Sequence, residues 1–142
     1  MVHSECRAVN VYGGIPEPAM PDRSTSTHVI SLTPFDQDGT LDLGALATHL
    51  DRLGGSGIGV YVGGSGSGEG YTLTRDERRA VFDTAVATLS GRVPVRAMGV
   101  EPRTAEAMIE MVADAADAGL DAAQVYSLDL GHGYRPRPVE LE

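Results

Sequence analysis

Short apolar segments recur along this chain about every 30 residues, and a helix signal follows each of the first three. The apolar segments are 28–34, 58–62, 93–98 and 122–128, and the helix starts fall at Asp42, Thr74 and Thr104. Successive strand–helix units of this kind build a parallel sheet rather than a β-sandwich. A closed (β/α) barrel and an open doubly wound sheet both fit the pattern. A closed barrel of eight units takes about 250 residues, whereas these 142 residues supply four units.

The helices have recognisable ends. Asp42 is the expected N-cap of the first helix, which stops at Gly54-Gly55. Thr74 and Glu77 form a capping box for the second helix, which should run to about Leu89. The third helix should run from Thr104 to about Gly119. The residues expected to be buried are Leu43, Leu46, Leu50 and Leu53 in the first helix, and Val81, Phe82, Ala85 and Val86 in the second.

The chain divides into a leader, residues 1–27, and a folded part, residues 28–142. The leader holds three prolines, a glycine pair and the run Ser24-Thr25-Ser26, without a sustained apolar period. Such a composition predicts a flexible segment. The strand–helix alternation begins directly after it.

Composition narrows the class of protein. Twenty acidic residues against eleven basic ones give a net charge of -9, so neither nucleic acid nor an anionic membrane surface is an expected partner. All eleven basic residues are arginine, and the sequence contains no lysine. The single cysteine, Cys6, cannot form an internal disulfide, and no cysteine or histidine spacing suggests a metal site. The prediction is a cytoplasmic protein without a metal or cofactor.

The glycine-rich run Gly63–Gly70 follows the second strand directly. Ligands of α/β proteins bind at the carboxyl ends of the strands. Glycine leaves backbone N–H groups unobstructed, and the hydroxyls of Ser65 and Ser67 add donors, so the loop suits a carboxylate or a phosphate. It contains no dinucleotide fingerprint, no Walker lysine and no nucleophile elbow. The alternative is a simple glycine–serine turn.

Three further residues admit two interpretations each, and a fourth admits one. Glu69 more simply hydrogen-bonds the loop backbone than acts as an acid. Tyr134, just after the fourth strand, could relay a proton or pack against its neighbours. Arg96, in the third strand, needs an anion or a carboxylate if it points inward, and is solvated if it points outward. Thr33, in the run Thr33-Pro34-Phe35, is interpreted as structural.

Several of these motifs, taken in order, resemble one known family. They are Leu32-Thr33-Pro34-Phe35 with Asp38-Gly39, the glycine loop ending in Gly68-Glu69, Leu73-Thr74 with Glu77-Arg78, and Gly133-Tyr134-Arg135-Pro136-Arg137-Pro138. Over about residues 28–142 the chain is similar to the dihydrodipicolinate synthase / N-acetylneuraminate lyase family. The resemblance implies an α/β fold, the N-terminal half of a (β/α)8 TIM barrel, in a homo-oligomer. It also implies Schiff-base aldolase or lyase chemistry on pyruvate or another 2-oxo acid.

The family pattern at the second strand is G-[ST]-T-G-E, which holds the carboxylate of the keto acid and helps to relay protons. Ser67, Gly68 and Glu69 match it, Gly66 stands at the first hydroxyl position, and Ser65 is an alternative source of that hydroxyl. The resemblance therefore implies Ser65, Gly66, Ser67 and Gly68 as substrate-binding residues. Tyr134 matches the tyrosine of the proton relay, so Tyr134 and Ser67 are the implied catalytic residues.

The family's Schiff-base lysine lies on the sixth strand, which would fall beyond Glu142. A Schiff base needs a primary amine, and arginine cannot replace lysine because its guanidinium stays protonated. The chain is therefore interpreted as the N-terminal half of such a lyase, inactive by itself. Its open strand edges and uncovered interior predict self-association. The alternatives are a non-catalytic half-barrel that binds a ligand or a partner, and a flavodoxin-like phosphate-binding domain.

Overall fold

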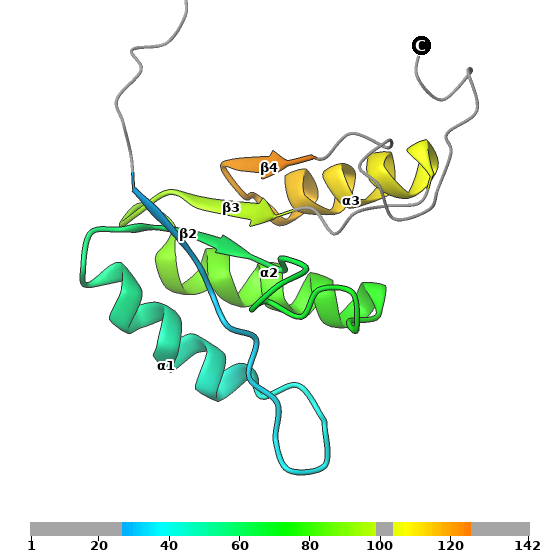
Figure 1. The fold of residues 1–142 in the computed structure, drawn as a ribbon. Coiled ribbons are helices and arrows are strands. Elements are labelled where there is room, and N and C mark those ends of the chain that lie inside the picture. Colours follow the sequence, from blue (N-terminus) through cyan, green and yellow to red (C-terminus); the bar gives the residue numbers. More distant parts are fainter. Residues whose placement is uncertain (1–26, 99–103, 126–142) are drawn as a thin grey trace, which may run out of the picture.

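A computed structural model describes residues 27–98 and 104–125 of the chain. Its elements, in order, are β1 (His28–Ile30), α1 (Leu43–Gly54), β2 (Gly59–Val62), α2 (Arg75–Leu89), β3 (Val95–Met98), α3 (Ala105–Ala118) and β4 (Ala122–Gln124). The strands pair in parallel and in the order β1-β2-β3-β4, so β1 and β4 form the sheet edges (Figure 1). The predicted succession of strand–helix units is confirmed. Each observed strand is shorter than the apolar segment that predicted it.

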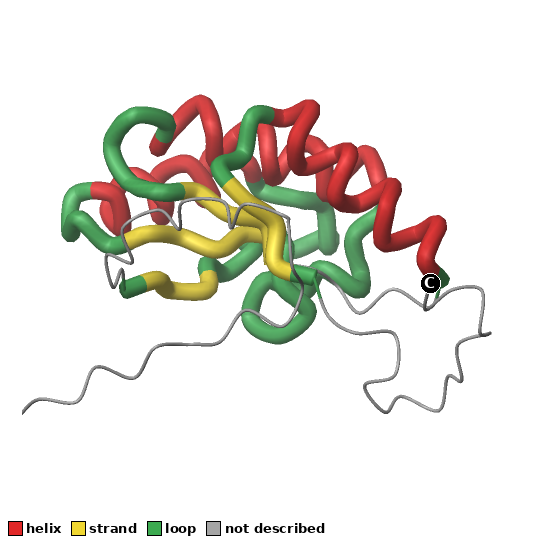
Figure 2. The backbone as a smooth tube through the Cα atoms, turned by 90° about the horizontal axis from the view of Figure 1, so that it is seen from above, coloured by secondary structure: helices red, strands yellow, loops and turns green. Residues whose placement is uncertain are grey.

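The three helices lie on one side of the four strands (Figure 2). A sequential strand order with all helices on one side is that of a segment of a (β/α)8 barrel. A doubly wound sheet reverses its strand order and carries helices on both faces. The flavodoxin-like alternative is therefore wrong, and the partial-barrel prediction is confirmed.

The core lies between the sheet and the helices. Its residues exposed by no more than 2% are Leu46, Leu50, Val60, Val62, Val81, Phe82, Ala85, Leu89, Val95, Ala97 and Ala115. Val86 is only half-buried, and Leu43 is 38% exposed because it is the first residue of α1. The 28–34 segment is not buried along its whole length. Ile30 and Leu32 are exposed because alternate residues of an extended chain point to the side that lacks helices.

The predicted helix starts are confirmed in atomic detail. The Asp42 carboxylate accepts a hydrogen bond from the Ala45 N–H at 2.8 Å, and the Thr104 hydroxyl accepts one from Ala107 at 3.1 Å. Thr74 and Glu77 form the full capping box. The N–H of Thr74 donates to the Glu77 carboxylate, which lowers the pKa of that carboxyl. Each of these contacts joins residues three positions apart, so a local sequence pattern is enough to predict it.

One contact between helices has no such local signal. The guanidinium of Arg75, at the start of α2, donates two hydrogen bonds to the Asp114 carboxylate of α3, at 3.0 and 2.7 Å. Arg78 approaches the same carboxylate at 3.5 Å, and the Asp114 side chain is 8% exposed. The hydrogen bonds from Arg75 lower the pKa of Asp114 below its ordinary value of 3.8. This carboxylate therefore ties α2 to α3.

Replacing Asp114 by Asn should destabilise the fold at neutral pH by about 2 kcal/mol, since hydrogen bonds to a charged group are lost. A carboxyl whose pKa is lowered on folding stabilises the protein above the unfolded-state value and loses that effect as the pH falls through the folded-state value. The difference between wild type and Asp114→Asn should thus hold at neutral pH and shrink below pH 3.8. Urea unfolding at a series of pH values measures it.

Asp83→Asn is the matched control, because the Asp83 carboxylate is 56% exposed and pairs with Arg79 one turn away. Its effect should be no more than about 0.5 kcal/mol. Equal effects of the two substitutions would contradict the assignment of Asp114.

Candidate substrate-binding site

The loop Gly63–Gly70 is closed upon itself at the carboxyl end of β2. The Gly70 N–H donates to the Gly64 carbonyl at 2.8 Å, and the Glu69 N–H donates to the Gly66 carbonyl at 2.9 Å. Gly68 lies against Gly64 so closely that a Cβ on Gly68 would stand 2.6 Å from the Gly64 nitrogen. A side chain at position 68 is therefore incompatible with this loop conformation.

Thr33 anchors the loop to the end of the first strand. Its hydroxyl donates a buried hydrogen bond of 2.6 Å to the Gly68 carbonyl, and Thr33 is 6% exposed. Thr33 therefore has a structural role, because it fixes the backbone of the candidate site. The two residues are 35 positions apart, so the sequence pattern alone could not pair them.

The middle of the loop offers hydrogen-bond donors. Ser65 is half-buried, whereas Gly66 and Ser67 are exposed. Among the residues that the structure describes, neither serine hydroxyl has a hydrogen-bond partner, and the N–H groups of residues 65–68 donate to no acceptor. A row of such donors at a strand end is suited to an anion such as a carboxylate.

The Glu69 side chain does not have the role that the sequence predicts. Its φ of 48° lies in the left-handed region, and its backbone carbonyl accepts hydrogen bonds from the N–H and hydroxyl of Thr72. Within residues 27–98 and 104–125, its carboxylate makes no hydrogen bond to the loop backbone. The expected role of the Glu69 side chain as a backbone acceptor is therefore not observed, because the turn is closed by the backbone itself.

The structure brings Ser65, Gly66, Ser67 and Gly68 together in this one loop. Tyr134 lies outside the described residues, so its predicted place beside them remains a prediction.

Arg96 lies in β3, on the side of the sheet that the helices leave open. The register pairs Arg96 with Tyr61. The Arg96 guanidinium donates to the Tyr61 hydroxyl at 3.3 Å and stands 5.9 Å from the centre of that ring. The His28 ring packs on Tyr61 with ring centres 5.2 Å apart. Arg96 is half-buried and faces the side of the sheet opposite the helices, which is the interior side of a (β/α)8 barrel.

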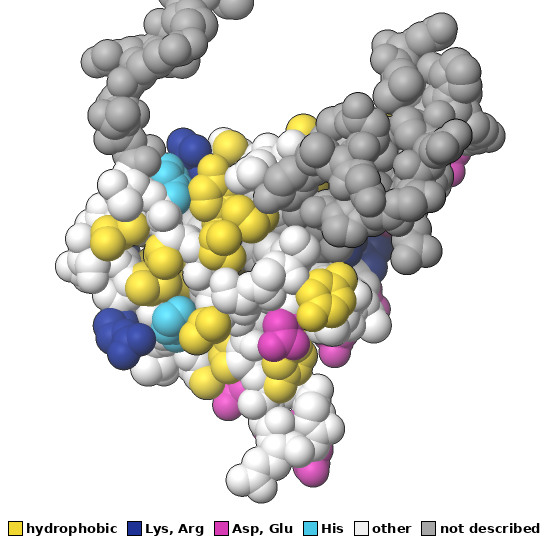
Figure 3. All heavy atoms as spheres, viewed as in Figure 1, with side chains coloured by type: hydrophobic (Ala, Val, Ile, Leu, Met, Phe, Trp, Pro, Cys, Tyr) yellow, Lys and Arg dark blue, Asp and Glu magenta, His cyan; other side chains and the backbone are white. Residues whose placement is uncertain are grey.

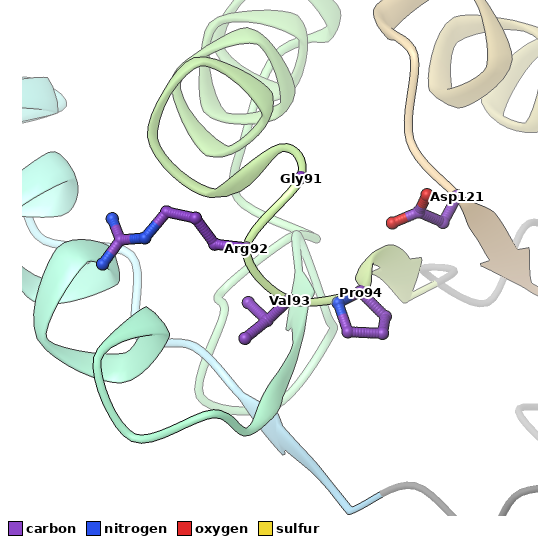
Figure 4. A pocket seen from close by; sticks show the side chains of 5 residues that line it. All are labelled: Gly91, Arg92, Val93, Pro94 and Asp121. Atoms are coloured by element: carbon purple, nitrogen blue, oxygen red, sulfur yellow. The ribbon is translucent and has the colours of Figure 1, made fainter.

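A shallow hollow of about 430 Å³ lies at the opposite end of the strands, lined by Gly91, Arg92, Val93, Pro94 and Asp121 (Figure 4). Its two charged groups are already engaged. Arg92 donates to the Asp51 carboxylate at 2.7 Å, and Asp121 accepts from the Val95 N–H at 2.7 Å. The hollow is therefore a less suitable ligand site than the glycine loop.

The described part of the chain contains no group of three or more histidine, cysteine, aspartate or glutamate side chains placed to hold a metal ion. No helix in it combines the length and apolar character that crossing a bilayer requires.

Parallel strands in sequential order, with helices on one side of the sheet, define a segment of a (β/α)8 barrel. The model of the dihydrodipicolinate synthetase family matches residues 24–126. The chain belongs to this family.

Similarity to individual proteins leads to the same family. Over 94 residues the chain is 35% identical to the 4-hydroxy-tetrahydrodipicolinate synthase of Bacillus subtilis, a match that covers 66% of this chain and 32% of the relative. Over 121 residues it is 37% identical to the enzyme of the same name from Methanothermobacter thermautotrophicus, covering 82% of this chain and 42% of the relative.

Solved structures give the same result. A dihydrodipicolinate synthase of Bacillus anthracis superimposes with a TM-score of 0.65 at 30% identity, covering 75% of this chain and 37% of that one. The Acinetobacter baumannii enzyme, solved in complex with pyruvate, gives a TM-score of 0.64 at 27% identity, with coverages of 70% and 34%. The chain thus spans about a third of the length of most of these relatives.

Proposed function

We propose that this chain supplies the first four strand–helix units, and the carboxylate-binding loop, of a Schiff-base lyase that acts on pyruvate or another 2-oxo acid. The observation that carries the proposal is the closed loop after β2, anchored by Thr33 through Gly68. Its N–H groups from residues 65–68 have no acceptor in the described structure. Membership of the family, and the pyruvate in the Acinetobacter baumannii relative, support a keto acid as the ligand.

Within this proposal the loop binds and orients the keto acid. Backbone N–H groups and the Ser65 or Ser67 hydroxyl donate to the substrate carboxylate, which places the neighbouring carbonyl carbon over the open end of the barrel. Ser67 and Tyr134 then carry the proton relay. In this assignment residues 1–27 form a leader and residues 28–142 the barrel segment.

The covalent step needs a primary amine, and within these 142 residues the α-amino group of Met1 is the only one. A Schiff base forms when a neutral primary amine attacks the keto carbon and water leaves. The sequence contains no lysine, so the chain alone is proposed to be catalytically inactive. The open edges β1 and β4 make self-association of the chain the expected state. Because lysine is absent, a non-catalytic module that binds a carboxylate remains the second candidate function.

The pyruvate site can be tested by titrating the 15N-labelled chain with pyruvate. The amide resonances of residues 65–68 should shift, and Ser67→Ala should weaken binding at least about tenfold, the order expected for one hydrogen bond to a charged group. Tyr71→Ala is the control, since Tyr71 is 69% exposed just past the loop. Shifts confined to other parts of the chain, or inorganic phosphate binding more tightly than pyruvate, would refute the keto-acid assignment.

Borohydride trapping separates binding from covalent chemistry. Treating the pyruvate complex with borohydride should give no adduct on any side chain, as intact-mass and peptide measurements would show. An irreversible adduct at a residue other than Met1 would contradict the proposed inactivity of the chain.

A further inference from the structure

One row of side chains crosses the side of the sheet that the helices leave open. The register pairs Ile30 with Tyr61 and Tyr61 with Arg96, so these three residues share a face. Val60 and Val95 point the other way, into the core. Figure 3 views the molecule from the open side and shows hydrophobic and histidine side chains uncovered there. In a complete (β/α)8 barrel this face becomes the interior, which layers of side chains fill.

Arg96 is incompletely partnered on this face. Its Nη1 donates to the Tyr61 hydroxyl, and its guanidinium lies near the Tyr61 ring. Its Nε is shielded from solvent and has no hydrogen-bond partner. The ion pairs formed among the described residues involve Arg75, Arg78, Arg79 and Arg92, and none includes Arg96. The neighbours Tyr61 and His28 supply no negative charge.

We propose that Arg96 is a carboxylate-binding site inside the barrel, and that an aspartate or glutamate side chain of the half that completes the barrel occupies it. Closure of the barrel encloses the guanidinium, which cannot lose its charge. A buried charge is tolerated when it is paired and hydrogen-bonded. The proposal rests on the proposed function in one respect, namely that further strand–helix units complete this barrel.

The layering of the interior limits where the acidic residue stands. Each layer takes its side chains from alternate strands, so Arg96 of β3 shares a layer with residues of the first, fifth and seventh strands. The residues of the β1 segment on this side are His28, Ile30 and Leu32, none of which is acidic. The partner is therefore assigned to the fifth or seventh strand.

The substrate carboxylate is a less suitable occupant. Arg96 pairs with Tyr61, two residues before Gly63, so it stands about 7 Å below the start of the loop along the strand. Met98, two residues after Arg96, lies at the top of the same face and packs against Gly64. A layer of side chains thus separates Arg96 from the glycine loop.

Acetate serves as a probe for the missing carboxylate side chain. Urea unfolding of the 142-residue chain is measured in sodium acetate and in sodium chloride at equal ionic strength. At an acetate concentration twice its dissociation constant, mass action should raise the folding equilibrium constant of wild type about threefold over chloride. Arg96→Met and Arg96→Gln should lose this specific gain. Arg52→Met, which removes an exposed arginine of α1, should keep it.

The outcomes are distinct. Equal acetate effects in wild type and both Arg96 variants would overturn the proposal. It would also be overturned if the half that completes the barrel carried no inward acidic residue on the fifth or seventh strand. An acetate effect lost in Ser67→Ala but kept in Arg96→Met would place the carboxylate in the glycine loop instead. If Arg96→Met still bound pyruvate and Ser67→Ala did not, the proposed function would be supported whatever the result of the acetate experiment. The two experiments therefore distinguish failure of the Arg96 proposal from failure of the proposed function.

Discussion

Replacing Gly68 by Ala is expected to cost about 3 kcal/mol of folding free energy, the upper end for overpacking, because the obstacle is backbone. The new Cβ would stand 2.6 Å from the nitrogen and 2.8 Å from the carbonyl oxygen of Gly64. Neither atom can rotate away, as the tip of a side chain could. The loop must open, so the hydrogen bond from Thr33 to the Gly68 carbonyl is strained or lost.

The same substitution should reduce pyruvate affinity at least about tenfold, since the donors of residues 65–68 are displaced together and each contributes about 1 kcal/mol. Urea unfolding and the pyruvate titration measure the two effects. Gly66→Ala is the matched control, because a Cβ on Gly66 meets nothing within 4 Å. If Gly66→Ala and Gly68→Ala behaved alike, the closed loop described above would be incorrect.

Phe82→Ala should destabilise the fold by about 3–5 kcal/mol. Phe82 is 1% exposed and is among the largest fully buried side chains of the described core. Its ring lies beneath the start of the glycine loop, 3.1 Å from the position of a Cβ on Gly63. The cavity left by the ring would therefore lie under the candidate site as well as between α2 and the sheet.

Denaturant unfolding with a constant m-value measures this change. Phe82→Leu fills most of the space and should cost less than about 1.5 kcal/mol. Tyr71→Ala removes the aromatic ring of a residue that is 69% exposed and should change stability by no more than about 0.5 kcal/mol. A Phe82→Ala variant as stable as Tyr71→Ala would show that the core is not packed as described.

The candidate site could be predicted in part. The sequence places the glycine loop at the end of the second strand, because the loop follows that apolar segment directly and ligands of α/β proteins bind at the carboxyl ends of strands. The role of Thr33 was missed, since nothing in Thr33-Pro34-Phe35 indicates that the hydroxyl reaches Gly68. The expected backbone contacts of the Glu69 carboxylate were also wrong, because the loop closes through main-chain hydrogen bonds.

By itself, the sequence determined the order of strands and helices and the residues at which α1, α2 and α3 begin. These features depend on side chains within four positions of one another, such as Thr74 with Glu77. Only the tertiary structure decided that Asp114 joins α2 to α3 and that Arg96 faces the open side of the sheet beside Tyr61. Both follow from strand register and helix packing, which bring together residues 35 to 39 positions apart and therefore leave no local pattern.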